Sequence, residues 1–195
     1  MRRRRNDNKS KQLMLGAFIV IVMVGSMFGV IFYGFNSNQE TFTHNKIKFT
    51  RANEWWTANL NNKKTYFNFL PPELENIKLS KEAANKLKNT MEVDITSDSN
   101  GNLTQEIALA QYYFANELSN TNSHVRVGFT GNNSFNAPVL TCNDATDFVP
   151  VIYFKESNLT QFTLNNNCLT VEIKSGIDAL KIKDKLLYAI FDILE

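Results

Sequence analysis

The sequence has few of the side chains that enzymes use for metal or nucleophilic chemistry. Its 195 residues include only two cysteines and two histidines. His44 and His124 lie far apart, without the spacing of metal ligands. The GxSxG, HExxH and GxGxxG motifs and the Walker phosphate loop are all missing. We therefore predict no catalytic, cofactor-binding or metal-binding residues, and we expect that the protein is not an enzyme.

Charge is also missing from a long stretch, since no charged residue occurs between Lys11 and Glu40. Inside this gap lies a run of 23 mostly apolar residues, 13–35, and a bilayer core needs about 20 as a helix. The run predicts a transmembrane helix. Six basic residues precede it and none follows before Lys46, which predicts a cytoplasmic N-terminus and a C-terminal part outside. A cleaved signal peptide is less favoured, because the run exceeds the usual apolar core of about 7–15 residues.

This span divides the chain into four segments. We predict a basic cytoplasmic tail (residues 1–12), the span (13–35), a short polar stalk (36–45) and one extracytoplasmic domain (46–195). Residues 1–35 carry six basic residues and one acidic residue, whereas the remainder carries 15 basic and 18 acidic residues. Because the outer part is mildly acidic, we expect no nucleic-acid partner. The predicted localisation is the cell membrane, crossed once.

Gly25 and Gly29 form a GxxxG spacing within the predicted span. Such a pair lets two membrane helices approach closely, so these glycines are a candidate dimer face. A single GxxxG is also common in membrane helices that do not associate, and the ordinary use of glycine is favoured.

Both cysteines, Cys142 and Cys168, fall in the outer part. An even count in a non-cytosolic compartment predicts one structural disulfide between them. A zinc site formed with His124 is the less favoured alternative. The outer part also contains three N-x-S/T sequons, so Asn102, Asn132 and Asn158 are candidate glycan acceptors.

The outer part shows alternating strand patterns interrupted by helical ones. Residues 46–70 predict a three-stranded meander with a turn at 61–64, and Pro71 ends it. Helices are predicted from Lys81 to about Thr90, after residue 102, and over 177–194, with Ser80 and Asn102 as caps. The strands between them are expected around 91–95, 125–129, 149–154, 161–164 and 168–173. Together these elements predict an α+β fold, a β-meander followed by a mixed α/β sandwich with residues 91–129 forming a parallel pair.

One segment, residues 96–107, is similar to an EF-hand loop. Asp98, Asn100, Gly101 and Leu103 fall at loop positions 3, 5, 6 and 8. The two end positions hold Thr96 and Ile107 where calcium loops place acidic ligands. A turn leading into a helix is therefore favoured, and calcium-dependent adhesion is kept as an alternative function.

The order strand–helix–strand followed by strand–strand–helix resembles a thioredoxin-like core. Pro150 precedes the strand 151–154, where that family keeps a cis-proline, although no CxxC motif follows the first strand. The resemblance implies a shared scaffold and, as an alternative function, a thiol or redox protein.

A second pattern covers most of the outer chain. It comprises Trp55-Trp56, Phe69-Leu70-Pro71, residues 142–146 (Cys-Asn-Asp-Ala-Thr), Pro150-Val151-Ile152 and Asn167-Cys168-Leu169. This pattern resembles uncharacterised archaeal single-pass membrane proteins. The resemblance implies a place at the membrane and no particular reaction. We therefore expect a non-enzymatic surface or envelope interaction module, or an accessory subunit of a membrane complex, with a protein partner.

Overall fold

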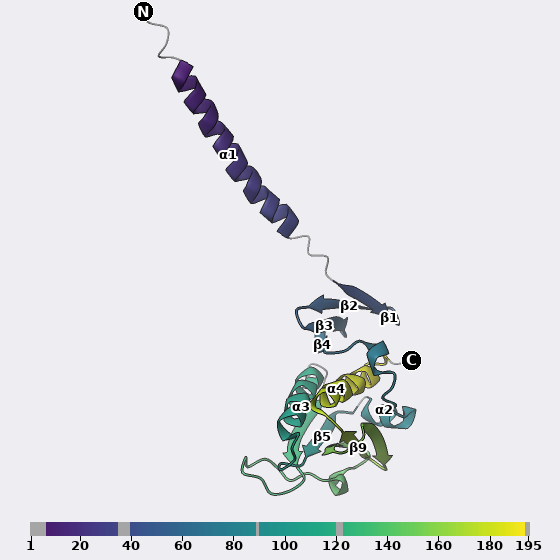
Figure 1. Cartoon of the computed structure of the whole chain (residues 1–195). Helices are drawn as coiled ribbons and strands as arrows, with labels where there is room; N and C mark the ends of the chain where they lie inside the picture. Colours follow the sequence, from purple (N-terminus) through teal and green to yellow (C-terminus); the bar gives the residue numbers. More distant parts are fainter. Residues whose placement is uncertain (1–6, 35–39, 89, 120–122, 194–195) are drawn as a thin grey trace, which may run out of the picture. The chain divides into compact units, whose positions relative to one another are not determined.

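The computed structural model describes residues 7–34, 40–88, 90–119 and 123–193, and within the first helix it describes side chains only for residues 13–26. The chain divides into two units, residues 1–39 and residues 40–195. We treat the two units separately (Figure 1).

The first unit contains one helix, α1 (Asp7–Gly34). Its described apolar side chains, from Leu13 to Val24, are about half to three-quarters exposed. No helix in the described part of the chain combines the length and the hydrophobicity needed to cross a membrane. The predicted span over residues 13–35 is not supported by this finding.

The second unit opens with a four-stranded antiparallel sheet in chain order. Its strands are β1 (Thr41–His44), β2 (Ile47–Ala52), β3 (Trp55–Leu60) and β4 (Lys63–Phe67). Asn61 and Asn62 both adopt positive φ values, as a two-residue hairpin turn requires. The turn predicted over 61–64 is thus confirmed at these two residues, whereas Lys63 and Lys64 belong to β4. The predicted meander has three strands, and the fourth is β1. It lies in the segment predicted as a stalk, because the pattern of Thr41–His44 is too short and polar to indicate a strand by itself.

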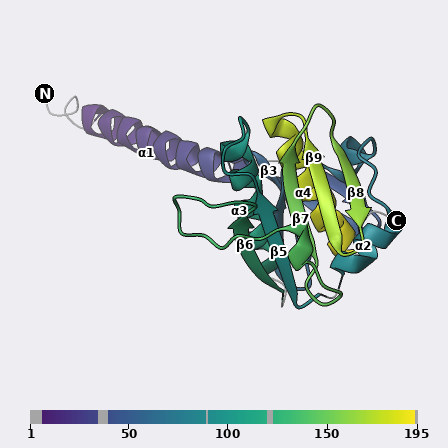
Figure 2. The same cartoon turned by 90° about the horizontal axis from the view of Figure 1, so that it is seen from below.

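A second sheet has five strands in the order β6-β5-β7-β9-β8 (Figure 2). These are β5 (Glu92–Ser97), β6 (His124–Phe129), β7 (Val151–Glu156), β8 (Gln161–Asn165) and β9 (Cys168–Ile173). The first four in this order are parallel, and β8 runs antiparallel to β9. The predicted parallel pair of β5 and β6 is confirmed. A mixed α+β fold with two sheets is thus present.

Four α-helices occur in the described chain: α1, α2 (Lys81–Leu87), α3 (Thr104–Ser119) and α4 (Gly176–Ile190). Short 3₁₀ turns lie at Pro71–Leu74 (η1) and Cys142–Asp144 (η2). The hydroxyl of Ser80 accepts a hydrogen bond from the backbone N–H of Ala83, which confirms the predicted cap of α2.

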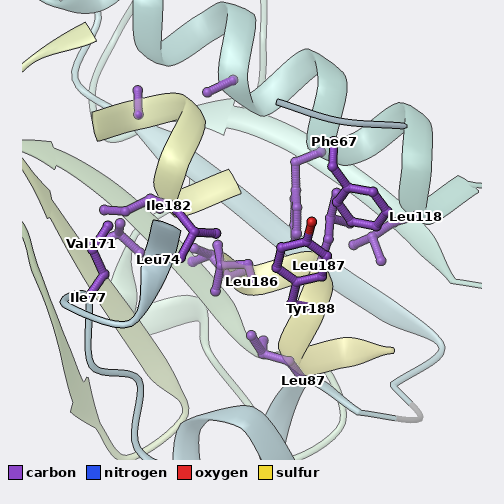
Figure 3. Close-up of a cluster of buried hydrophobic side chains, with 14 of the residues drawn as sticks. Phe67, Leu74, Ile77, Leu87, Leu118, Val171, Ile182, Leu186, Leu187 and Tyr188 are labelled. Atoms are coloured by element: carbon purple, nitrogen blue, oxygen red, sulfur yellow. The ribbon is translucent and has the colours of Figure 1, made fainter. Parts of the chain in front are cut away.

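Helix α4 lies between the two sheets of the second unit, beside α3 (Figure 1). All eight residues from Ile182 to Ala189 are buried, so both sides of the helix are covered. On one side the ring of Tyr188 stacks on Phe67 of β4, with the ring centroids 4.4 Å apart (Figure 3). On the other side the core continues into Ile152 and Val171 of the five-stranded sheet.

Buried carboxylates fix the meander to the helices. The carboxylate of Asp184 accepts hydrogen bonds from the backbone N–H groups of Asn68 (2.7 Å) and Phe69 (2.9 Å) and contacts the ammonium of Lys183. Burial raises the pKa of Asp184 to about 6, against the opposing effects of Lys183 and the two N–H groups. Burial likewise raises the pKa of Glu117 on α3, whose carboxylate accepts from the backbone N–H of Tyr66.

The thioredoxin-like order gains no support from this topology. β7 lies parallel to both of its neighbours, and its partner β9 is reached through the hairpin strand β8. No cis peptide bond occurs among the described residues, so the bond before Pro150 is trans. What remains of the resemblance is the order of elements along the chain.

Candidate interaction surface

The carboxyl ends of the parallel strands are the edge where open α/β sheets bind ligands. The chain leaves β5 for β6 on one side and then returns across β5 to β7, which places a topological switch point between β5 and β7. Such a switch point opens a crevice beside the start of the following helix, where anions bind. An anion-binding site is therefore expected in this crevice.

Here the protein fills the crevice with its own carboxylate. Glu156, the last residue of β7, accepts hydrogen bonds from the backbone N–H groups of Asn102 (2.7 Å) and Leu103 (3.3 Å). It also accepts from the side-chain amide of Asn102 (3.1 Å). The hydrogen bond from the Asn102 amide, together with those from the two backbone N–H groups, lowers the pKa of Glu156. The anion position at the start of α3 is thus occupied from within the chain.

This arrangement corrects the predicted cap of α3. Sequence reasoning assigned the cap to the side chain of Asn102, yet that side chain donates to Glu156. The cap comes from a residue 54 positions further along the chain, which no local pattern can reveal.

The segment from Thr130 to Pro150, which we call the crossover loop, connects β6 to β7. It covers part of the sheet face opposite α3 and α4. Val93 and Ile95 of β5 point into the helical core, so the alternate residues Asp94 and Thr96 face the other way. The hydroxyl of Thr96 donates to the carbonyl of Leu140 (2.7 Å), which seats the crossover loop on this face.

The edge of β6 also holds the loop. Phe129 donates through its backbone N–H to Pro138 (3.0 Å), and Leu140 donates to the carbonyl of Phe129 (2.9 Å). Gly128 makes this approach possible, since a Cβ there would collide with the carbonyl oxygen of Pro138 and lie 2.9 Å from the Leu140 side chain.

Short-range hydrogen bonds shape the crossover loop internally. The side chain of Asn133 accepts from the backbone N–H groups of Phe135 and Ala137 (both 3.1 Å) and donates to the carbonyl of Ala137 (3.1 Å). Asp144 accepts from the backbone N–H (2.7 Å) and the hydroxyl (2.9 Å) of Thr141. These two bonds lower the pKa of Asp144.

The predicted disulfide between Cys142 and Cys168 is confirmed, with the Cα atoms 5.2 Å apart. It ties the crossover loop to the first residue of β9. Cys168 is buried, whereas Cys142 is exposed on the loop. The bond therefore fixes an exposed loop to the rigid sheet.

Beside the loop, an ion pair joins β5 to the edge strand. The fully buried carboxylate of Asp94 receives two bonds from Arg126 of β6, at 2.8 Å from Nε and 2.5 Å from Nη2. Hydrogen bonding to Asp94 raises the pKa of Arg126. Both groups are engaged with each other, so this pair positions β6 and presents no acid–base chemistry.

The fixed crossover loop exposes apolar side chains. Phe148 is 85% exposed, Phe135 69% and Val139 48%. The ring of Phe135 stacks on Phe129 of β6, with the centroids 5.6 Å apart. A hollow of about 420 Å³ lies beside Phe135, between the crossover loop and the turn after β5 (Ser99, Asn100, Asn132, Asn133, Ser134, Phe135). We call these exposed side chains, Phe135, Val139 and Phe148, together with the hollow, the loop surface. It extends along the crossover loop, because Phe135 lies by the carboxyl ends of β5 and β6 and Phe148 lies by the amino end of β7.

Sequence reasoning identified the cysteine of this loop but missed its exposed phenylalanines. The available signal was an aromatic residue inside a polar segment rich in Asn, at Phe135 and again at Phe148. Periodicity cannot separate such a residue from a core residue, because the loop has no regular period.

The three sequons differ in their surroundings. The side-chain amide of Asn102 is bonded to Glu156, as described above. Asn132 is exposed at the start of the crossover loop, and Asn158 is exposed between β7 and β8. Glycan attachment at these three positions stays a prediction.

The other predicted sites are not brought together. No group of three or more metal-ligating His, Cys, Asp or Glu side chains occurs within the described residues. In the EF-hand-like segment, Asp98 accepts from the backbone N–H of Asn100 (2.9 Å), as in an ordinary turn. Gly25 lies in α1 with no atom near a notional Cβ, and the surroundings of Gly29 fall outside the described side chains.

No protein-family model matches the sequence, and neither a curated protein nor a solved structure shows significant similarity to it.

Proposed function

We propose that the protein is a single-pass membrane protein whose C-terminal α+β domain is an extracytoplasmic, non-enzymatic interaction module. The loop surface is the observation that carries the interaction role. A pre-formed loop binds at a lower entropic cost than a flexible one, because its backbone is ordered before the partner arrives. Exposed aromatic side chains on such a loop are the residue type that dominates the energy of protein interfaces.

Two features of the site favour binding over catalysis. At the switch point, the backbone N–H groups that would bind a substrate anion already donate to Glu156. The charged pair next to the loop, Asp94 and Arg126, is consumed by mutual hydrogen bonds. Neither feature offers a group poised to transfer a proton or to attack a substrate.

The membrane anchor is supported by the sequence. The apolar run begins at Leu13, the described side chains of α1 end at Ser26, and the run continues through residue 35. The basic residues before it and the polar, mildly acidic chain after it favour a cytoplasmic N-terminus. This topology also puts the disulfide in an oxidising compartment.

Photo-crosslinking from the loop surface tests the interaction role. Benzoylphenylalanine placed at Phe135 or at Phe148 should yield the same discrete adduct in native membranes. Tyr112 on α3 is 66% exposed and provides a matched aromatic control away from the loop. Identical adducts from all three positions, or none from Phe135 and Phe148, would contradict the proposal.

Topology is measured separately. In intact cells, external protease should cleave the C-terminal domain, while a tag before Arg2 stays protected. The full chain should remain in the membrane pellet after alkaline carbonate extraction, and a variant with Ile19→Arg and Val22→Arg should be released. Release of the unaltered chain would contradict the anchor without bearing on the loop surface.

A further inference from the structure

A second surface feature is a groove between α2 and α4, whose lining includes no residue of the crossover loop. The groove has a volume of about 650 Å³, within the range of small-molecule sites. Lys81, Ala84, Asn85 and Lys88 line it from one face of α2, and Lys185, Ala189 and Asp192 line it from α4 and the residues after it. The connecting segment 75–79 closes the remaining side.

The groove is positively charged in a domain that is acidic overall. Four lysines line it against two carboxylates, Glu75 and Asp192. The ammonium of Lys88 contacts Asp192, so one carboxylate is already neutralised. No ion pair of Lys78 or Lys81 occurs among the described residues. The lysines that remain without an ion pair give the groove a net positive charge, which attracts an anion.

Lys185 is the unusual member of this set, because it is only 8% exposed. Its ammonium donates to the carbonyl of Leu74 (3.1 Å). An ammonium has three donors, and a buried one is costly unless they are satisfied. Burial lowers the pKa of Lys185, while Glu75 opposes this shift. A second acceptor inside the groove would stabilise the charged form.

The rest of the lining is apolar. Ile77 and Ala189 are buried, and Leu79 and Ala84 are half-buried. Ile77 belongs to the main core, where it lies in the same cluster as Leu186 of α4 (Figure 3). The groove thus combines these apolar side chains, which we call its floor, with four lysines.

We infer that this groove binds a small amphipathic anion, with a carboxylate or phosphate head at Lys185 and an apolar body on the floor. Lys78 and Lys81 on the rim attract the head group, and Lys185 receives it. This site is separate from the loop surface and does not depend on the membrane anchor. The groove would bind a small molecule, in addition to the macromolecular partner proposed for the loop surface.

Isothermal titration of the full chain in dodecyl maltoside, with detergent blanks, tests the inference. The probes are hexanoate and hexyl phosphate, which share an apolar chain and differ in the head group. At least one of them should bind with a 1:1 stoichiometry. Hexanol, which lacks the charge, and acetate or inorganic phosphate, which lack the chain, should bind at least tenfold more weakly. The stronger of the two alkyl probes identifies the head group.

Substitutions locate the site. Lys185→Met keeps the length of the side chain and should weaken binding at least tenfold, whereas Lys155→Met, an exposed lysine on β7, should leave it unchanged. The double variant Lys78→Gln/Lys81→Gln keeps Lys185 and should weaken binding severalfold, with a smaller salt dependence. Melting temperatures of the unliganded variants show that each is folded.

Three results would overturn the inference. They are the absence of binding by both alkyl probes, hexanol binding as tightly as hexanoate, and unchanged affinity in folded Lys185→Met. Binding of inorganic phosphate as tight as that of hexyl phosphate would overturn the role of the apolar floor.

Discussion

Asp184 is a buried carboxylate whose charge is costly to the folded protein. Its pKa of about 6 exceeds the ordinary value of 3.8, because burial outweighs the stabilisation from Lys183 and the N–H groups of Asn68 and Phe69. Between these two values the folded state binds more protons than the unfolded state. The free energy of unfolding should therefore increase as the pH is lowered from about 6 to 4, by roughly 2–3 kcal/mol from this group. Burial raises the pKa of Glu117 and acts in the same direction.

Chemical denaturation at several pH values checks this prediction. Asp184→Asn should remove most of the gain between pH 6 and 4, while Asp147→Asn, whose side chain is 82% exposed, should retain it. In the single variant the buried Lys183 loses its closest counter-charge and keeps only the more distant carboxylate of Glu117, which costs roughly 3–5 kcal/mol. The double variant Lys183→Met/Asp184→Asn avoids that cost and should show the same flattened pH profile. A profile in either variant as steep as that of the unaltered chain would contradict the assignment.

Gly128 lies where the crossover loop passes close to β6. Gly128→Ala should push the loop away from β6, because its Cβ would meet the carbonyl of Pro138. We expect a loss of about 1–3 kcal/mol in the free energy of unfolding, together with the loss of the bond from Phe129 to Pro138. Gly131→Ala is the matched control, since its Cβ would enter open space. Denaturant titration measures both, and equal effects would contradict the close approach.

At the scale of the elements, the disulfide adds a covalent attachment of the crossover loop to β9. Removing the disulfide with Cys142→Ser/Cys168→Ser should cost about 3 kcal/mol, as expected for closing a loop of 26 residues. Amide hydrogen exchange should rise in residues 131–149 and stay unchanged in β2 and β3. Exchange that rises equally in both regions would show that the bond stabilises the whole domain without ordering the loop in particular.

The elements themselves were largely predictable from the sequence. The strands β5 to β9 and the helices α2 to α4 follow from local alternation, helical spacing and the cap at Ser80, since these signals need only neighbouring residues. The cap of α3 was not predictable, because Glu156 reaches it across the sheet from β7. The parallel pairing of β7 with β9 was not predicted either. Because β8 lies between them in the sequence and forms a hairpin with β9, the local pattern does not indicate that β9 also pairs with β7.

The burial of both sides of helix α4 could not be predicted from its hydrophobic periodicity. Its apolar residues form a wide arc that predicts packing on a sheet, and charged residues such as Lys183, Asp184 and Lys185 carry no local sign that they are buried. All three are buried. Asp184 lies against the chain just after β4, and Lys185 lies against Leu74 of η1. These segments are more than a hundred residues earlier in the chain, so no pattern within the helix records them. The groove at Lys185 was not predictable either, because α2 and residues 75–79, which line it with α4, are about a hundred residues earlier in the chain.

At the scale of the second unit, the two sheets share one core through α4. Phe67 of β4 stacks on Tyr188, whose hydroxyl donates to the carbonyl of Phe69 (2.7 Å), and the same helix carries Leu186 and Ile182 into the core. The meander spans only residues 41–67, and chains shorter than about 40 residues rarely bury enough surface to fold alone. Its stability therefore depends on α4, and that of α4 on the meander.

This mutual dependence predicts a single unfolding transition for residues 40–195. The only tryptophans, Trp55 and Trp56, lie in β3 and report on the meander, whereas far-ultraviolet circular dichroism reports on all the elements. The two signals should change together with denaturant. Phe67→Ala should shift both by the same 3–5 kcal/mol, because it removes a fully buried ring from the shared core, while Tyr66→Ala, 40% exposed on the same strand, should shift them by much less. If tryptophan fluorescence in Phe67→Ala changed at a lower denaturant concentration than circular dichroism, the meander would unfold as an independent unit. The stability of α4 would then not depend on the meander that covers it.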